Sequence, residues 1–389
     1  MRPRAFPIVV AGFSAFLDLY ATQPLLPELA GTFHASHFAV SLTVTAPTVA
    51  VALSAPFIGR LADRAGMRRT IIASAFALAA ATALAATAAD LRQLIAWRFV
   101  QGLAAPGIFS IAIAYIHEEW PAARAGSTTA AYVAGTVVGG FIGRGLMGGL
   151  AGTAGWQVAF LVLGALNFAA ALVIWRTLPA EQRSGRRRLE PFVATAAAHL
   201  ENRQLVAAYA TGFCILCAQV ATFTYVTFYL AAPPYGLSTA ALGSIFVTYL
   251  LGAIVTPVAG RWIDRYGRRP AFIAAVVLGI ASVLLTLVPS LAVILAGLSL
   301  FGTSVFITQA TASSHVAANA PRGRALAVGL YATCYYLGGT LGSAAPAAMW
   351  KSGGWPACVT FVIVVQAAML LVAWRTWDDE GGAAELMTA

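Results

Sequence analysis

The feature that most constrains this chain is a series of apolar runs, each about 20 residues long, separated by short polar loops. A helical run of that length spans the ~30 Å hydrocarbon core of a bilayer. Of the 389 residues, 60% are hydrophobic and only 10% are charged, against about 25% charged in an average soluble domain. This composition excludes a water-soluble fold of this length, and the sequence predicts an all-α polytopic membrane protein.

Twelve transmembrane helices are expected in the cell (inner) membrane. The first follows two arginines, as in a signal peptide, but it is too long for one, so we expect an uncleaved helix. The approximate spans are 5–29, 39–61, 70–88, 91–115, 127–150, 156–178, 204–231, 239–259, 270–288, 290–314, 325–349 and 355–377.

The basic residues predict the orientation of these spans. The net charge is +10, and all but four of the 24 Lys and Arg residues lie in the termini or in loops that follow even-numbered spans. Because basic loops stay in the cytoplasm, both termini are expected there. The same rule explains the net charge without a nucleic-acid partner. The partners expected are a small-molecule substrate, protons and the lipid bilayer, and we expect a monomer.

The longest connection, residues 179–203, carries five arginines and is expected to be a basic cytoplasmic linker near anionic lipid. It separates an N-terminal six-helix bundle, 1–178, from a C-terminal six-helix bundle with a short cytoplasmic tail, 204–389.

The chain also repeats itself at an offset of about 200 residues. GRLADRAGMRR at 59–69 matches GRWIDRYGRR at 260–269, and the glycines near 139 recur near 338. The sequence therefore predicts two pseudo-symmetric bundles in parallel orientation. Two such bundles with a cavity between them can open to either side in turn, which is the architecture of a secondary transporter.

Three buried charges distinguish the first bundle. Asp18, Arg98 and Arg144 lie within predicted spans, where one charge costs about 2.5–3.5 kcal/mol. Their counterparts in the second bundle are neutral: Ala218, Leu298 and Ser343. This asymmetry predicts a specialised polar site in the outer half of the N-terminal bundle, where we expect the three charges to meet.

Two interpretations of Asp18 and Arg98 remain open. A carboxylate that moves between wet and dry surroundings can load and release a proton, so Asp18 with Arg98 is a candidate for proton coupling. The structural alternative makes Asp18 a partner of a buried arginine, either Arg98 or Arg144, and makes Arg98 a partner of Asp18 or of backbone carbonyls.

Further polar and aromatic side chains in the spans are candidates for a substrate cavity or gate, with helix–helix hydrogen bonding and packing as the alternative. They are Tyr20, Gln23, Gln101, Arg144, Gln219, Tyr225, Gln309 and Tyr335, and Asn167 is an additional polar candidate.

Over nearly its whole length the chain resembles the major facilitator superfamily, because GRLADRAGMRR and its repeat match that superfamily's loop motif. RFVQG at 98–102 resembles the R-x-x-Q-G motif of proton-coupled members, and residues 135–144 resemble the antiporter motif g-x3-G-P-x2-G-G. The chain departs from that motif at Gly140, where Pro is usual, and at Arg144, where Gly is usual. The resemblance is greatest to the twelve-span drug/proton antiporter branch, near its sugar-efflux and arabinose-efflux-permease-like members.

The resemblance implies an intracellular conformational latch between the bundles that favours the outward-open state. The residues of this latch are Gly59, Asp63, Arg64, Gly66, Arg68, Arg124, Gly260, Asp264, Arg265, Gly267, Arg268 and Arg324. It also implies a bending role for the span 5 glycines, for which general close packing is the alternative. These glycines are Gly135, Gly139, Gly140 and Gly143.

The predicted function is a proton-coupled secondary transporter that exports a small organic solute, drug or sugar by substrate/H⁺ antiport. The alternative is a proton-coupled uptake symporter for a small organic anion or sugar, and a membrane receptor or enzyme is a remote third possibility. The sequence has no G-x4-G-K-[ST] loop for ATP and no catalytic constellation, so no enzyme activity is expected. No cofactor or metal is expected either, since Cys214 and Cys217 have no third ligand beside them.

Overall fold

The structure is a computed structural model, and it describes residues 5–181, 192–249, 267–320 and 324–377. Every element in these ranges is a helix, so the predicted all-α fold is confirmed. Ten helical segments of the described residues are long and apolar enough to cross a membrane, with Phe6–Thr32 counted as one segment. The two other predicted spans are 239–259, which lies partly outside the described residues, and 325–349, which comprises α14 and the beginning of α15.

The chain forms two compact units, each described here by itself. Unit 1 contains residues Met1–Arg188 and Thr227–Phe246, and unit 2 contains Leu189–Val226 and Val247–Ala389. The helices are α1 (Phe6–Leu19), η1 (Gln23–Leu25), α2 (Leu26–Thr32), α3 (His37–Ala65), α4 (Met67–Ala85), α5 (Leu91–Glu119), α6 (Ala122–Ala154), α7 (Trp156–Thr177), α8 (Phe192–Glu201), α9 (Arg203–Ala231), α10 (Thr239–Ser244), η2 (Ile245–Val247), α12 (Arg268–Leu285), α13 (Leu291–Asn319), α14 (Arg324–Ala344) and α15 (Pro346–Thr376).

The first predicted span is broken, which corrects the expectation of a single helix over 5–29. Helix α1 ends at Leu19, and η1 and α2 continue after a turn at Tyr20–Thr22. Pro24 and Pro27 lack a backbone N–H, and each proline ring displaces the carbonyl four residues earlier, so an α-helix cannot continue unchanged through this segment. The break leaves backbone carbonyls of α1 without helical partners.

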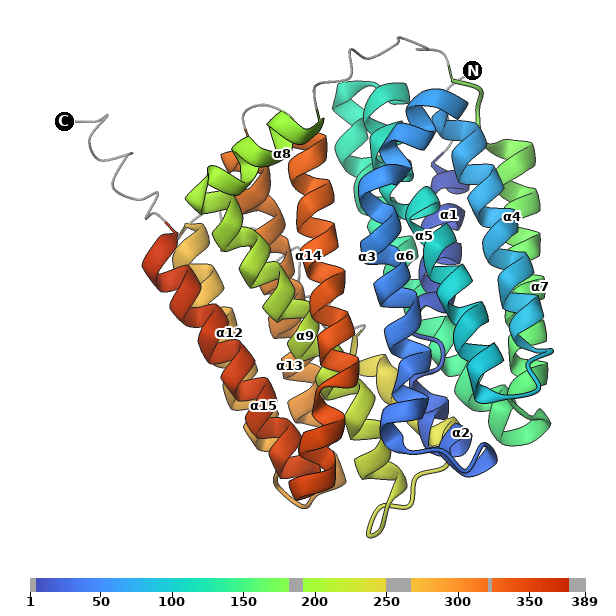
Figure 1. The fold of residues 1–389 in the computed structure, drawn as a ribbon, viewed down its shortest axis with the longest axis vertical. Coiled ribbons are helices and arrows are strands. Elements are labelled where there is room, and N and C mark those ends of the chain that lie inside the picture. Colours follow the sequence, from blue (N-terminus) through green and yellow to red (C-terminus); the bar gives the residue numbers. More distant parts are fainter. Residues whose placement is uncertain (1–4, 182–191, 250–266, 321–323, 378–389) are drawn as a thin grey trace. The chain divides into compact units, whose positions relative to one another are not determined.

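Helix α1 occupies the centre of unit 1, where it contacts α3, α4, α5, α6 and α7 (Figure 1). Its approach to α6 is a backbone contact. A Cβ atom added to Gly139 would lie 2.2 Å from the Phe13 carbonyl oxygen, and one added to Gly143 would lie 1.9 Å from that of Leu17. No side chain fits in that space, so the glycines allow the two helices to touch.

The same contact recurs in unit 2. A Cβ atom on Gly338 would lie 1.9 Å from the Phe213 carbonyl oxygen, and one on Gly342 would lie 2.2 Å from that of Cys217. The sequence leaves packing and bending open as roles for the glycines of span 5. Gly139 and Gly143 lie in close packing between α6 and α1, and a bending role for these glycines stays a prediction.

Candidate functional site

The site in unit 1 is a hydrogen-bond network around the carboxyl group of Asp18, which is 1% exposed. Its Oδ2 atom accepts from the Thr82 hydroxyl at 2.8 Å and from Nδ2 of Asn167 at 2.6 Å. The Ser14 hydroxyl donates to Oδ1 of Asn167 at 2.7 Å, which orients that amide toward Asp18. Helices α1, α4 and α7 each contribute a side chain, so the network joins three helices of the unit.

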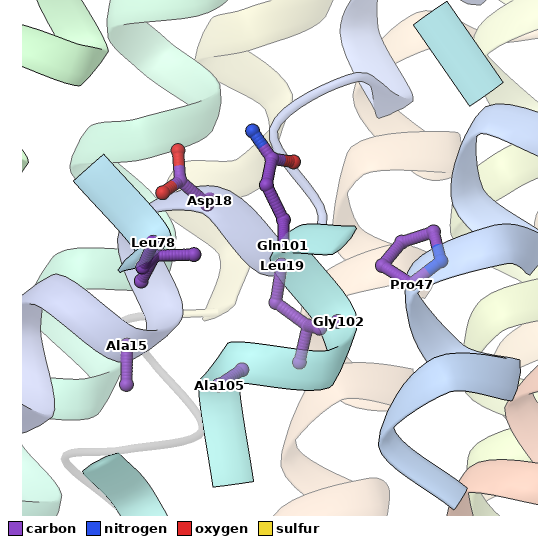
Figure 2. Close-up of a pocket in the computed structure, with 8 residues that line it drawn as sticks. All are labelled: Ala15, Asp18, Leu19, Pro47, Leu78, Gln101, Gly102 and Ala105. Atoms are coloured by element: carbon purple, nitrogen blue, oxygen red, sulfur yellow. The ribbon is translucent and has the colours of Figure 1, made fainter. Parts of the chain in front are cut away.

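The second oxygen of Asp18 differs from the first. Among the described residues, Oδ1 is buried and has no hydrogen-bond partner. Asp18 lines a pocket too narrow to hold a water molecule. Figure 2 shows the side chains of Asp18 and Gln101 extending toward the same side of this pocket from α1 and α5. The lining residues are Ala15, Asp18, Leu19, Pro47, Leu78, Gln101, Gly102 and Ala105.

Arg98 of α5 is fully buried and serves the break in α1. Its Nη1 donates to the backbone carbonyl of Asp18 at 2.8 Å, and its Nη2 donates to that of Leu19 at 2.7 Å. Its Nε donates to the carbonyl of Thr43 on α3 at 3.0 Å. The guanidinium group thus supplies the donors that the last turn of α1 lacks, and its positive charge is favourable at a helix C-terminus.

Gln101, one turn after Arg98, connects the arginine to the carboxyl network. Its Oε1 accepts a hydrogen bond from Nη1 of Arg98, and its Nε2 donates to Oγ1 of Thr82 at 3.0 Å. The sequence left Asp18 or backbone carbonyls open as partners of Arg98. In the structure its Nε, Nη1 and Nη2 donate to backbone carbonyls. The side chain of Asp18 receives its hydrogen bonds from Thr82 and Asn167, and from neither Arg98 nor Arg144.

Arg144 lies apart from this network, contrary to the expectation that the three charges meet. Its Nε donates to Oε1 of Gln23 at 2.9 Å, and its Nη1 donates to the carbonyl of Gly140 at 2.7 Å. The guanidinium carbon stands 5.1 Å from the ring centroid of Tyr20 and 4.8 Å from that of Phe246. These distances are typical of cation–π contacts, and Arg144 is only 6% exposed.

Three cavity candidates of unit 2 contact residues outside their own helix, and Tyr335 contacts Tyr331 within α14. Nε2 of Gln219 donates to the Tyr249 hydroxyl at 3.1 Å. The Tyr225 hydroxyl donates to the carbonyl of Ser343 at 3.1 Å. Oε1 of Gln309 accepts from the Tyr331 hydroxyl at 2.9 Å, and the Tyr331 ring stacks with that of Tyr335 at 6.0 Å between centroids.

The loop motif before α4 binds the end of α7. Nη2 of Arg68 donates to the carbonyl of Trp175 at 2.9 Å, and its Nε donates to that of Leu178 at 2.8 Å. Oε1 of Glu181 accepts the backbone N–H of Arg68. Gly66 has a φ of 93°, a left-handed conformation that favours glycine.

The repeated motif makes the equivalent contact in unit 2. Nη2 of Arg269 donates to the carbonyl of Trp374 at 2.7 Å, near the end of α15, and Gly267 has a φ of 87°. Arg268 donates from Nε to the Ser314 hydroxyl at 3.0 Å. Each motif therefore binds the end of a helix of its own unit, α7 in unit 1 and α15 in unit 2.

The other latch residues are placed as follows. The side chains of Asp63, Arg64 and Arg124 are exposed, Gly59 lies on the exposed face of α3, and Arg324 begins α14. Gly260, Asp264 and Arg265 lie outside the described residues.

Sequence reasoning missed several members of the site. Thr82, Ser14 and Thr43 are ordinary residues in apolar spans, and Asn167 was noted only as a polar candidate. Phe246 and Glu181 were not considered. One signal was present for Thr82 and Asn167: a polar residue recurs at the equivalent positions, Ser282 and Gln366.

Comparisons with known proteins agree with this architecture. The model of the Major Facilitator Superfamily matches residues 8–343 and 231–386. The chain is 30% identical to the uncharacterized MFS-type transporter YybF of Bacillus subtilis (strain 168), covering 94% of this chain and 91% of the relative. It is 28% identical to the inner membrane transport protein YnfM of Escherichia coli (strain K12), covering 94% and 88%.

Two solved structures share the fold. A bacterial homologue of the human lysosomal transporter Spinster, inward-facing and occupied, has a TM-score of 0.78 at 17% identity over 96% of each chain. The nucleoside transporter NupG has a TM-score of 0.79 at 13% identity over 96% of this chain and 100% of that one. The chain is a multi-pass membrane transporter that belongs to the major facilitator superfamily.

Proposed function

We propose that the protein is a proton-coupled exporter in which Asp18 carries the proton. The observation that supports this most directly is the unequal bonding of its two carboxyl oxygens. Oδ2 accepts from Thr82 and Asn167, whereas Oδ1 is buried with no partner among the described residues. A proton can bind Oδ1 without loss of either bond to Oδ2.

The ionised form of this carboxyl has a different requirement. A buried anionic oxygen without a hydrogen bond is costly, and the pocket that Asp18 lines is too narrow for a water molecule. Loss of the proton therefore favours a conformation in which polar groups or water reach Asp18. Proton occupancy and conformation become linked, as antiport by alternating access requires.

The transported substrate is proposed to be a small organic solute, drug or sugar, with export by proton antiport preferred over uptake by symport. We also propose that both termini and the linker 179–203 are cytoplasmic, that the linker separates two six-helix bundles, and that the protein acts as a monomer. The positive-inside distribution of Arg and Lys supports the orientation. A cysteine introduced at Ser184 should react only with reagents that reach the cytoplasmic side.

The test of the proton site compares wild-type protein with Asp18→Asn in liposomes. A trapped pH-sensitive dye reports proton movement while a panel of sugars, organic acids and dyes is added under pH gradients of either sign. In wild type, one panel member should be driven uphill by the proton gradient, and the sign of the effective gradient separates export from uptake. Asp18→Asn keeps the shape of the side chain but cannot ionise, so it should exchange substrate without proton movement.

The expected size of this effect is well above assay scatter. A proton that moves down 100 mV supplies about 2.3 kcal/mol, and each pH unit adds about 1.4 kcal/mol. Loss of one coupled proton should therefore reduce the attainable substrate gradient by about tenfold or more. The matched control is Asp90→Asn, which changes an exposed capping carboxylate of α5. Uphill transport by Asp18→Asn at the wild-type level would make Asp18 structural.

A further inference from the structure

The outer half of α6, toward Ala154, makes a second backbone contact within unit 1. A Cβ atom on Gly148 would lie 2.7 Å from the carbonyl oxygen of Thr239 and 2.8 Å from Cα of Gly243. A Cβ atom on Gly243 would in turn lie 3.0 Å from Cα of Gly148. The two glycines thus bring α6 and α10 together so closely that no side chain separates them.

Arg144 lies one turn before Gly148 on the same helix and extends this contact. Its guanidinium carbon lies 5.1 Å from the ring centroid of Tyr20, at the break after α1, and 4.8 Å from that of Phe246, in η2. Its Nε donates in the plane of the group to Gln23, in η1. A planar guanidinium can stack on two rings and donate at its edge at the same time, so one side chain connects α6 with η1 and η2.

This connection depends on the residue found at position 144 of this chain. The antiporter motif that residues 135–144 resemble has glycine there, and glycine reaches neither ring. The partners of Arg144 are also close in sequence to the proposed proton site at Asp18. Tyr20 and Gln23 follow Asp18 by two and five residues, and Arg98 binds the carbonyls of Asp18 and Leu19 just before the break.

We propose that Arg144, Tyr20, Gln23 and Phe246, together with the Gly148–Gly243 contact, form an outer gate that is closed in this structure and must separate when the transporter opens outward. The assignment of this end of α6 to the outer side rests on the proposed topology and function. A change at Asp18 or Arg98 that moves the break after α1 also moves Tyr20 and Gln23. The gate therefore provides a direct link from proton occupancy to opening.

The experiment is a disulfide between α6 and α10. A Cβ atom on Gly152 would lie 3.9 Å from Cβ of Ala240, within the range of about 3.5–4.5 Å found in disulfides. Gly152→Cys and Ala240→Cys are introduced after the four native cysteines are replaced by alanine. Oxidation with copper phenanthroline is followed by tagging of the remaining thiols with polyethylene glycol maleimide. Most protein molecules that carry both introduced cysteines should cross-link rapidly.

The role of Arg144 is measured by the cross-linking rate, which requires no transported substrate. Arg144→Gln should slow cross-linking by about threefold or more, because the closed gate loses population. Phe246→Leu removes one ring but keeps an apolar side chain, and it should also slow cross-linking. Arg92→Gln changes an exposed arginine in the first turn of α5 and should leave the rate unchanged. The proposal would be overturned if the cysteine-pair protein cross-linked at the same rate with and without each of the two gate substitutions.

The control pair is Gly149→Cys with Ala240→Cys, because a Cβ atom on Gly149 meets nothing within 4 Å. Rapid cross-linking of this pair would mean that collisions, and not a closed gate, explain the result. In liposomes the oxidised Gly152–Ala240 pair should stop substrate exchange, and dithiothreitol should restore it. If fully cross-linked protein exchanged substrate as fast as the same protein after dithiothreitol treatment, the proposal would also be overturned. If Asp18 does not carry the proton, the cross-linking results stand unchanged.

Discussion

Units 1 and 2 use the same packing contacts but differ in the polar groups at their centres. Gly139 meets the carbonyl of Phe13 in unit 1, and Gly338 meets that of Phe213 in unit 2. Unit 1 then places Asp18 and Arg98 at positions where unit 2 has Ala218 and Leu298, both buried.

The arginine contacts repeat as well, and polar residues recur at the positions of Thr82 and Asn167, but Asp18, Arg98 and Gln101 have no polar counterpart in unit 2. Arg68 binds the carbonyl of Trp175, and Arg269 binds that of Trp374. Gln101, which joins Arg98 to Thr82 in unit 1, corresponds to Phe301 in unit 2. Duplicated residues therefore maintain the scaffold, whereas residues present in one copy are the candidates for transport chemistry. Substitutions at paired positions test this division.

The largest effect is expected at Arg98, whose guanidinium group donates four buried hydrogen bonds. Arg98→Leu copies the residue of unit 2 and leaves three backbone carbonyls without their donor. Each unsatisfied buried group costs about 1–3 kcal/mol, so we expect a loss of folded protein in thermal unfolding monitored by size exclusion. Leu298→Met, its matched control, should cost less than about 1.5 kcal/mol. Equal behaviour of the two variants would remove the distinction between the units.

Next in size are the glycines, for which both units should respond alike. Gly143→Ala and Gly342→Ala each place a methyl group against a backbone carbonyl, at 1.9 Å and 2.2 Å before any relaxation. Overpacking of this kind costs about 1–3 kcal/mol, measured as a lower midpoint of thermal unfolding. Gly145→Ala on the same helix meets nothing within 4 Å and should not lower it. If only one of the two variants had a lower midpoint of thermal unfolding, the idea of a scaffold shared by both units would be contradicted.

Asn167 and Gln366 form the most direct test of the asymmetry. Asn167→Leu removes a donor to Asp18 and an acceptor for Ser14, and we expect a loss of about 1–3 kcal/mol. Gln366→Met should be neutral or stabilising, because Nε2 of Gln366 is buried without a partner among the described residues. A large destabilisation by Gln366→Met would show that unit 2 also has a polar network.

The smallest effects are expected for the arginines of the loop motifs. Arg68→Gln and Arg269→Gln each remove a charge-assisted bond to carbonyls near the end of a helix, worth about 0.3–1 kcal/mol at an accessible site. Both variants should fold, and hydrogen exchange should increase in the last turns of α7 and α15 respectively. Unchanged exchange in both would indicate that these arginines do not stabilise the helix ends.

Much of the fold was predictable because the bilayer limits the choices. Hydrophobic runs predicted the positions of most of the long described helices to within about five residues, but α15 begins at Pro346 and not at 355, and α8 lies within the predicted linker. The duplicated motifs predicted that contacts would repeat between the two halves. The break after α1 was not predicted as such, although Pro24 and Pro27 are visible in the sequence. Proline indicates that a helix is disturbed, but neighbouring residues decide whether it bends or stops.

The site was predictable only in part. Asp18 and Arg98 stand out because a charge in an apolar span is costly, and their nearness was expected. Which atoms bond was not predictable: Arg98 binds backbone carbonyls, and Asp18 is bound by Thr82 and Asn167. A threonine in a span usually bonds to its own helix, so nothing local identifies Thr82 as a partner of Asp18.

The sequence by itself determined the membrane class, the number of expected spans and the restriction of the buried charges to one half. These properties depend on composition and on the order of residues along one helix. Only the tertiary structure decided that Arg144 joins Tyr20, Gln23 and Phe246 and does not join Asp18. That choice depends on how α6 rotates and packs against α1 and α10, and the close approach of glycine-lined backbones sets it. Long-range packing, and not local propensity, therefore places each charge beside its partner.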